Sequence, residues 1–459
     1  MNPVRNNNLM GRTKISNGMK PFLIKPITTL KGEIFLLGDK SIAHRSIIFS
    51  SLSKGITRIK NFPRNKDCLS TIKALRKLGV RINKKADTIT VCGRGLKGLK
   101  RPRGPIFAGE SGTTFRLMLG VLAGQDFQSR LLAGMALSSR PMLRVTRPLR
   151  LMGAKIEARR EKRAGRLEDF PPVTISAGRL KGITYKLPVA SAQVKSAILL
   201  AGLYASGKTV VIEPTSTRDH TERMLQQFGV SLGLNNKKIY LKNCKPLLSP
   251  KIMNIPGDIS SAGFFIVLAS ILPDSKIVIK NVSLNPSRLG LIKVLQRMGA
   301  DIRLTLNKNK TSKFEPSGSI KVKSSLLKGI SVKKEEIPSL IDELPILMVA
   351  ACCAAGVTVL EDVGELRVKE TDRIRSMYVN LRKMGAEVNV ARVKGGESIL
   401  IQGKTALKGT KVRSYQDHRT AMSMVVAGLA ASGTSSLDDV SCINKSFPEF
   451  LQVLGSLKA

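Results

Sequence analysis

One hydrophobic pattern recurs along the whole chain. Apolar residues at helical spacing lead to Leu-x-x-hydrophobic-Gly, and the alternation of a half-buried strand follows. The copies end 70 to 86 residues apart, the last one being degenerate, at Gly79, Gly153, Gly229, Gly299, Gly385 and Gly455. Glycine there permits the left-handed conformation that often ends a helix. The pattern predicts six units of helix and strands, three in each of two pseudo-symmetric α/β domains.

A second repeat relates the first unit to the fourth. Residues 34–46 (IFLLGDKSIAHRS) and 254–266 (NIPGDISSAGFFI) share a Gly-Asp turn before a helix, but Lys40 and Arg45 have no basic counterparts in the second copy. Equivalent positions predict equivalent corners of the two domains, where the chain crosses between them. A bound anion at only one corner would explain why the cations are not repeated.

Two segments need to be distinguished from membrane and targeting signals. The apolar run Ile346–Leu360 is shorter than the roughly 20 residues of a membrane-spanning helix, so it predicts a buried helix that leads into a strand. Residues 1–20 are basic and lack acids, which weakly suggests a transit peptide. A disordered extension or a start codon placed too early explains them better.

The chain of 459 residues carries a formal net charge of +45, which raises the question of a nucleic-acid partner. The charge is spread along the whole sequence, aromatic residues make up only 4%, and there is no Trp for base stacking. Solvated surfaces explain most of this charge.

The six cysteines contain no CxxC pair, and the chain has only three histidines. This composition predicts no zinc site and favours free thiols in a reducing cytoplasm.

Several segments of the first half place polar or basic residues near predicted helix starts. They are GDKSIAHR (38–45), GESGTTFR (109–116), SSRPMLR (138–144), LPVASAQVKSAILLAG (187–202) and PTSTRDHTERM (214–224). Helix N-termini favour anions, and nearby Lys or Arg strengthens the preference. Helix capping explains GESGTTFR about equally well. For LPVASAQVKSAILLAG and PTSTRDHTERM, a simple helix start or a capping network is the preferred explanation.

The second half sets carboxylates among cations in three segments, IDELP (341–345), LRVKETDRIR (366–375) and SYQDHR (414–419). Proton transfer on an anionic substrate needs this combination, because the cations bind the substrate and a carboxyl group exchanges the proton. A salt-bridged surface helix is the simpler explanation for any one segment.

Together, these segments resemble the 5-enolpyruvylshikimate-3-phosphate synthase family from about residue 22 to the C-terminus. The family's motifs occur in its order and spacing, as GDKSIAHR, SGTTFRLM, RPMLRV, PVASAQVKSA, TRDHTERM, IDELP, LRVKETDRI, QDHRTAM and NKSFPEF. The SAQVKSA form is typical of bacterial members.

The resemblance implies two inverse α/β domains of three βαβαββ units each, which close on substrate. It places one domain at 39–255, a discontinuous one at 21–38 plus 256–459, and crossover strands near 36–40 and 254–258. We expect a cytoplasmic monomer without metal or organic cofactor. The implied reaction transfers the enolpyruvyl group of phosphoenolpyruvate to the 5-hydroxyl of shikimate 3-phosphate through a tetrahedral intermediate, releasing phosphate.

The resemblance also implies roles for individual residues. Shikimate 3-phosphate would be held by Lys40, Ser41, Arg45, Ser191, Ala192, Gln193, Arg218, Asp342 and Lys369. Phosphoenolpyruvate would be held by Lys40, Gly112, Arg140, Gln193, Arg373, His418, Arg419 and Lys445. Asp342 would accept or orient the 5-hydroxyl proton, Glu370 would exchange a proton with the methylene carbon, and Lys40 would act as an acid toward the bridging oxygen.

The chain departs from the family at two places beside the expected phosphoenolpyruvate pocket. The family usually has Gly-Asp-x-Ser-Leu where this chain has Ala133, Gly134, Met135, Ala136 and Leu137. An Asn common before the Ser/Ala-Gly-Thr turn is Glu110 here. Both departures could alter the affinity for phosphoenolpyruvate.

Two alternatives remain open on sequence grounds. The paralogous UDP-N-acetylglucosamine enolpyruvyl transferases resemble this family but carry a reactive Cys in a mobile loop, and neither GESGTTFR nor the RPM segment contains a Cys. A nucleic-acid-binding protein on the same scaffold would be supported only by the net charge.

Overall fold

The computed structural model describes residues 21–163, 165–242, 246–307, 315–393 and 396–457. The expectations for residues 1–20 and for Cys244 lie outside this part of the chain. The described cysteines are free thiols. In the described ranges, no helix is both long and apolar enough to cross a bilayer.

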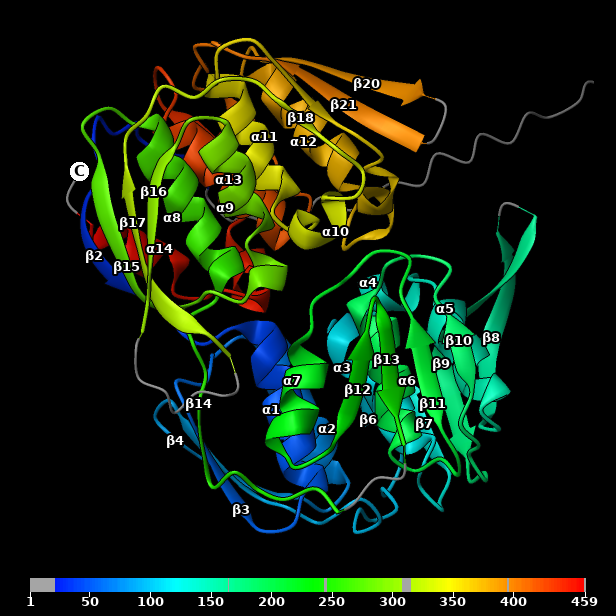
Figure 1. Cartoon of the computed structure of the whole chain (residues 1–459). Helices are drawn as coiled ribbons and strands as arrows, with labels where there is room; N and C mark the ends of the chain where they lie inside the picture. Colours follow the sequence, from blue (N-terminus) through cyan, green and yellow to red (C-terminus); the bar gives the residue numbers. More distant parts are fainter. Residues whose placement is uncertain (1–20, 164, 243–245, 308–314, 394–395, 458–459) are drawn as a thin grey trace, which may run out of the picture.

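The described residues form six small sheets, three in each of two bodies (Figure 1). The N-terminal body has its core between Ile42 and Ile255. The C-terminal body combines core residues between Ile24 and Leu36 with those between Ile259 and Leu457. The fold class is confirmed, whereas the domain boundaries stay predictions that these two cores support.

The three sheets of the N-terminal body have four strands each, which neighbour one another in the following order. They are β14 (Ile252–Asn254), β3 (Ile56–Lys60), β5 (Thr88–Cys92) and β4 (Arg81–Lys85); β6 (Ile106–Phe107), β7 (Ser129–Leu132), β9 (Arg166–Ser176) and β8 (Lys155–Arg163); and β10 (Thr184–Lys186), β11 (Thr209–Ile212), β13 (Lys238–Leu241) and β12 (Leu232–Asn235).

The sheets of the C-terminal body are β2 (Lys31–Phe35), β15 (Lys276–Ser283), β17 (Ser317–Lys323) and β16 (Asp301–Leu306); β18 (Ser331–Val332), β19 (Val357–Leu360), β21 (Gly396–Gln402) and β20 (Glu387–Val393); and β22 (Lys411–Val412), β23 (Ser435–Leu437) and β1 (Phe22–Ile24). Every four-stranded sheet has one parallel pair followed by two antiparallel pairs, and the three-stranded sheet has one pair of each kind. This common topology is the structural form of the sequence repeat.

Helices occupy the centre of each body (Figure 1). The N-terminal body contains α1 (Lys40–Leu52), α2 (Lys66–Lys77), α3 (Gly112–Leu122), α4 (Met135–Ser138), α5 (Leu143–Leu151), α6 (Ala192–Gly202) and α7 (His220–Gln227). The C-terminal body contains α8 (Ile259–Ile271), η1 (Pro286–Arg288), α9 (Gly290–Arg297), α10 (Ile337–Leu340), α11 (Leu344–Cys353), η2 (Gly364–Val368), α12 (Arg373–Lys383), α13 (His418–Leu429), η3 (Ser441–Lys445) and α14 (Phe450–Gly455).

Four of these helices are buried almost all round. In α8 and α11, nearly every side chain is apolar and buried, as expected for helices without a polar face. The helices α1 and α13 are also buried, but they include buried polar side chains such as Arg45 and Arg419. The run Ile346–Leu360 lies in α11 and β19, which confirms the prediction of a buried helix followed by a strand.

The repeated glycines end their helices as predicted in five of the six copies. Gly79, Gly153, Gly229, Gly299 and Gly385 have φ between +83° and +101°. The sixth prediction was wrong, because Gly455 is the last residue of α14 and is not among the glycines with positive φ. The backbone stays right-handed there, since Ser456 after it has φ of −82° and ψ of −13°.

The two Gly-Asp turns lie against each other. Gly38 and Gly257 form an antiparallel bridge, and the Asp39 N–H donates to the Pro256 carbonyl at 2.8 Å. Asp39 caps α1, and Asp258 caps α8. The starts of the two helices are therefore fixed to each other where the bodies meet.

Candidate active site

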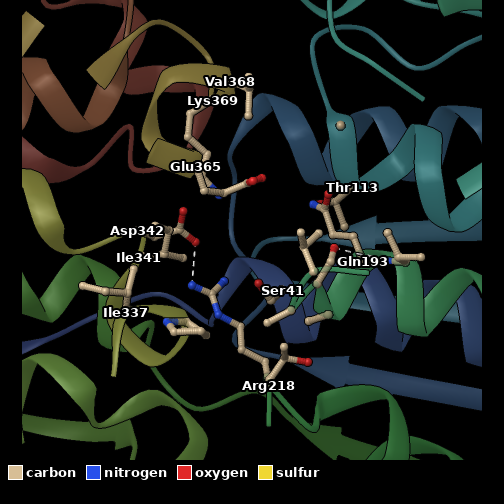
Figure 2. Close-up of a pocket in the computed structure, with 18 of the residues that line it drawn as sticks. Ser41, Thr113, Gln193, Arg218, Ile337, Ile341, Asp342, Glu365, Val368 and Lys369 are labelled. Atoms are coloured by element: carbon tan, nitrogen blue, oxygen red, sulfur yellow. Dashed lines mark hydrogen bonds and ion pairs between the residues drawn. The ribbon is translucent and has the colours of Figure 1, made fainter. Parts of the chain in front are cut away.

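A cavity of about 520 Å³ is lined by residues of both bodies. Figure 2 shows Ser41, Thr113, Gln193 and Arg218 facing Asp342 and Lys369 across it. The structure brings almost all of the predicted site residues to this cavity, namely Lys40, Ser41, Arg45, Gly112, Arg140, Ser191, Ala192, Gln193, Arg218, Asp342, Lys369, Glu370, Arg373, His418 and Arg419.

Three helices of the N-terminal body begin at this cavity. The N-cap side chains of α1, α3 and α6, which are Asp39, Ser111 and Ser191, each accept a hydrogen bond from a first-turn backbone N–H. The first residues of these helices line the cavity. Their N-termini therefore add partial positive charge at a site already rich in Lys and Arg.

Arg45 is buried beside the cavity and is held by three oxygen acceptors. Its Nε donates to Thr221 Oγ1 at 2.7 Å, its Nη2 to Ser196 Oγ at 2.8 Å and its Nη1 to the Ser41 carbonyl at 3.0 Å. Burial lowers the pKa of Arg45 to about 10, which leaves it charged at neutral pH. It is a fixed cation beneath Ser41.

Lys40 is the first residue of α1, and its ammonium donates to Asp67 Oδ2 at 3.2 Å. Burial would lower the pKa of Lys40, but the carboxylates of Asp67 and Glu370 outweigh this and raise it above its ordinary value. Lys40 is therefore a cation at neutral pH. Loss of its proton would require a change in these neighbours, for example on substrate binding.

Gln193 is oriented by two residues of α3. Arg116 Nη1 donates to Gln193 Oε1 at 2.7 Å, and Gln193 Nε2 donates to Thr113 Oγ1 at 2.9 Å. Burial and the nearby Arg140 lower the pKa of Arg116 to about 9. The amide is therefore held in one orientation at the cavity wall.

Arg140 lies over the start of α3. A Cβ atom added at Gly112 would come within 3.2 Å of Arg140 Nη1. The same Nη1 atom is 3.5 Å from Glu370 Oε1 of the C-terminal body. Arg140 Nε is buried and has no hydrogen-bond partner among the described residues, so it has donor capacity left for a ligand.

The pair of Arg218 and Asp342 spans the cavity. Arg218 Nη2 lies 2.5 Å from Asp342 Oδ2, as the dashed line in Figure 2 marks. Burial would raise the pKa of Asp342, but Arg218, Arg419 and other nearby cations hold it well below its ordinary value. Asp342 is ionised at neutral pH, so it can accept a proton but cannot supply one.

Glu370 is held by Arg373, which in turn is fixed by a buried carboxylate. Arg373 Nη2 donates to Glu370 Oε2 at 2.5 Å, and Arg373 Nε donates to Asp417 Oδ2 at 2.9 Å. Burial would raise the pKa of Glu370, but Arg373 and Arg140 hold it well below its usual range. With these neighbours, Glu370 is a carboxylate at neutral pH.

His418 follows Asp417 at the start of α13 and lines the cavity. Burial and the charge of Lys40 lower its pKa to about 3. Neither ring nitrogen has a hydrogen-bond partner among the described residues. His418 is thus a neutral ring with one donor and one acceptor available.

Two of the predicted lysines differ in their placement. Lys369 lines the cavity, and burial lowers its pKa from the ordinary value. Lys445 does not line the cavity, and its ammonium donates to the Gln416 carbonyl at 3.0 Å. It supports the segment that leads to Asp417, and a direct contact with substrate stays a prediction.

The polar cavity residues that were not identified from the sequence include Asp67, Thr113, Arg116 and Arg288. Thr113 and Arg116 lie inside the GESGTTFR segment, so its helical spacing could have revealed them. Asp67 and Arg288 stand in segments without a distinctive pattern, and only the packing of distant helices brings them to the site. Arg288 donates to Asp39 Oδ2 at 3.1 Å, which ties η1 to the first Gly-Asp turn.

These contacts define what the site can do. Cations from both bodies converge on a cavity that could hold two small polyanions, and Asp342 and Glu370 lie among these cations as ionised proton acceptors. Such a site favours reactions in which negative charge is stabilised while a proton moves to or from a carboxylate.

Comparison with known proteins agrees with this geometry. Residues 24–454 match the family described as EPSP synthase (3-phosphoshikimate 1-carboxyvinyltransferase). A Bacillus cereus (strain B4264) protein named 3-phosphoshikimate 1-carboxyvinyltransferase is 45% identical over 96% of this chain and all of its own length. A Bacillus thuringiensis (strain Al Hakam) protein of the same name is 44% identical with the same coverage.

Solved structures extend the similarity to three dimensions. A structure of EPSP synthase from Acinetobacter baumannii superposes with a TM-score of 0.82 at 40% identity, covering 96% of this chain and all of that one. At this identity and coverage, the chain belongs to the EPSP synthase family, the 3-phosphoshikimate 1-carboxyvinyltransferases.

Proposed function

We propose that this enzyme joins the enolpyruvyl group of phosphoenolpyruvate to the 5-hydroxyl oxygen of shikimate 3-phosphate and releases phosphate, as a step of aromatic amino-acid biosynthesis. The observation that carries the proposal is a cavity in which Asp342 and Glu370 stand among cations of both bodies, in a chain of the EPSP synthase family. Both substrates are polyanions, so fixed cations are needed to offset their repulsion.

Shikimate 3-phosphate is assigned to the side of the cavity formed by α1, α6 and the Arg218 loop. Arg45 and Arg218 supply fixed positive charge, and Ser41, Ser191 and Ala192 lie at or beside helix N-termini. Lys369 and Asp342 approach from the C-terminal body. In this placement, Asp342 faces the hydroxyl group that attacks.

Phosphoenolpyruvate is assigned to the side formed by the starts of α3, α12 and α13. Arg140, Arg373 and Arg419 supply positive charge, and Lys40 lies at the boundary between the two substrates. Gly112 leaves room for the ligand, because a side chain there would point at Arg140.

The reaction then proceeds in two steps. In the addition step, the 5-hydroxyl oxygen forms a bond to C2 of phosphoenolpyruvate, its proton passes to Asp342, and Glu370 in its protonated form gives a proton to C3. In the elimination step, the bond from C2 to the phosphate oxygen breaks, Lys40 donates a proton to that oxygen, and Glu370 takes the proton back from C3. After the product leaves, the proton on Asp342 returns to Lys40 through solvent, so that both groups regain their starting protonation states.

Glu370 must gain a proton before it can act as an acid, and the cations around it explain how substrate binding would favour this. Its low pKa comes from Arg373 and Arg140, the same cations that are assigned to phosphoenolpyruvate. When the substrate's anionic groups compete for these guanidinium groups, the stabilisation of the Glu370 carboxylate weakens and its pKa rises. Substrate binding thereby prepares Glu370 as an acid.

Neither alternative from the sequence is favoured. The match to the EPSP synthase family covers nearly the whole chain, and no described cysteine lines the cavity. Nucleic-acid binding still rests only on the net charge of +45. A cytoplasmic location and a monomeric state stay predictions.

The test is phosphate release from phosphoenolpyruvate by the purified protein, with shikimate 3-phosphate in one reaction and UDP-N-acetylglucosamine in another. Release only with shikimate 3-phosphate is expected. Release only with the nucleotide sugar would show that the enzyme catalyses the reaction of the UDP-N-acetylglucosamine enolpyruvyl transferases instead. No release with either acceptor would contradict the proposal.

A further inference from the structure

Glu110 connects two loops at the edge of the cavity. It stands two residues before Gly112, the first residue of α3, and its carboxylate accepts hydrogen bonds from the start of α4. The Leu137 N–H donates to Glu110 Oε2 at 2.8 Å, and the Ala136 N–H donates to Oε1 at 3.4 Å. Glu110 therefore supplies from a distant loop the cap that a residue at the helix start normally provides.

The residue at the start of α4 has no side chain that could cap the helix. The N-cap residue of α4 is Gly134, which has φ of −68° and makes no side-chain capping bond. Its backbone conformation does not require glycine, but a Cβ atom there would lie 2.6 Å from Glu110 Cδ. Glycine is needed because the Glu110 carboxyl group occupies that space.

The two departures from the usual family sequence are therefore linked, because each side chain limits the other. The family usually has Asp at the position of Gly134 and Asn at the position of Glu110. In this chain the carboxylate stands on the α3 loop as Glu110, and the residue that it faces on the α4 loop is Gly134.

The joined loops carry phosphoenolpyruvate-side residues. The Arg140 N–H donates to the Leu137 carbonyl at 3.0 Å, directly after the turn that Glu110 caps, and the Gly134 N–H donates to the Gly109 carbonyl at 2.8 Å. The Arg140 guanidinium in turn lies against Gly112 and Glu370. A shift of the α4 start would therefore move Arg140 relative to α3.

We propose that Glu110 is a positioning residue for phosphoenolpyruvate: by capping α4 across the space left by Gly134, it sets the place of Arg140 over Gly112. The inference rests on the proposed function and deepens it. It predicts that Glu110 and Gly134 depend on each other, and that their joint effect falls on one substrate only.

Four variants test this: Glu110→Ala, Gly134→Asp, the double variant Glu110→Asn with Gly134→Asp, and Glu387→Ala as a control at an exposed glutamate of β20.

In Glu110→Ala, the KM for phosphoenolpyruvate should rise about tenfold, because two hydrogen bonds to a charged acceptor are lost. The KM for shikimate 3-phosphate should stay within about twofold of the parent value. Gly134→Asp alone should raise the same KM at least about tenfold, since two carboxyl groups then compete for one space. The double variant should return to within about threefold of the parent.

Amide hydrogen exchange gives a readout that does not need turnover. Exchange at Ala136 and Leu137 should accelerate in Glu110→Ala and return toward the parent value in the double variant. An unchanged KM for phosphoenolpyruvate in Glu110→Ala, an equal rise for both substrates, or a double variant no better than Gly134→Asp would overturn the proposal. Absence of activity in the parent protein would instead contradict the proposed function, and the exchange data would still decide whether Glu110 caps α4.

Discussion

Arg218 Nη2 and Asp342 Oδ2 lie 2.5 Å apart, one from each body, across the cavity. The same carboxylate is 3.5 Å from Arg373 and 4.0 Å from Arg419. Asp342 therefore links the two bodies and is an ionised group in the cavity.

Asp342→Asn should remove the proton acceptor while it keeps the size of the side chain. We expect kcat to fall by at least about 100-fold, the range of general base catalysis, with a smaller effect on substrate binding. Steady-state kinetics at pH 7 measure this. Because the pKa of Asp342 lies well below its ordinary value of 3.8, its titration should not reduce parent activity between pH 7 and pH 5.

Glu370→Gln should leave both substrates bound but stall proton transfer to and from C3. The expected loss in kcat is again at least about 100-fold. Calorimetric binding of shikimate 3-phosphate, compared with turnover, separates binding from chemistry. A loss below tenfold, or about 1.4 kcal/mol on the barrier, would exclude Glu370 from this role.

Lys40→Met should mainly abolish the use of phosphoenolpyruvate, because it removes the cation at the boundary of the two substrates and leaves Asp67 without its partner. Lys60→Met, at an exposed end of β3, is the matched control and should behave as the parent. Turnover retained with an unchanged KM for phosphoenolpyruvate would contradict the assignment of Lys40.

Gly112→Ala should weaken the binding of phosphoenolpyruvate more than the binding of shikimate 3-phosphate. The new Cβ would lie 2.8 Å from Arg116 Nη1 and 3.2 Å from Arg140 Nη1, so at least one guanidinium group must move. We expect a KM for phosphoenolpyruvate about tenfold higher, the scale of one weakened charged contact. Gly455→Ala, where a Cβ meets nothing within 4 Å, is the control, and equal kinetics in the two variants would disprove the crowding argument.

Asp39→Asn tests the junction between the bodies through the pH dependence of stability. Burial would raise the pKa of Asp39, but Arg288 and other nearby groups lower it to about 2, from an ordinary value of 3.8. A carboxylate with a lowered pKa stabilises the fold above about pH 4 and loses this effect as the pH falls toward 2.

The variant should therefore lose stability at pH 7, by about 2–3 kcal/mol for a pKa lowered from 3.8 to about 2, and the difference from the parent should shrink toward pH 2. Urea unfolding across this pH range measures it, with the exposed Asp126→Asn as control. A difference that does not change with pH would mean that the charge of Asp39 contributes nothing.

The amino-acid sequence by itself determined the repeat and most of the site. Helical spacing that closes on Gly79, Gly153, Gly229, Gly299 and Gly385 predicted the ends of five helices, because only glycine adopts the left-handed conformation without a steric cost. Almost all of the residues that the motifs predicted for the site line the cavity. Local sequence carries this information because caps and helix ends depend on neighbours in the chain.

The tertiary structure decided which distant residues meet. Asp67 reaches Lys40 only because α2 packs beside α1, and the ion pair of Arg218 with Asp342 joins residues 124 positions apart. The relation of Glu110 to Gly134 was visible in the sequence only as two unrelated departures. The reason is physical: a side chain that fills space or neutralises charge is defined by what lies next to it in three dimensions, and the order of the chain does not state that.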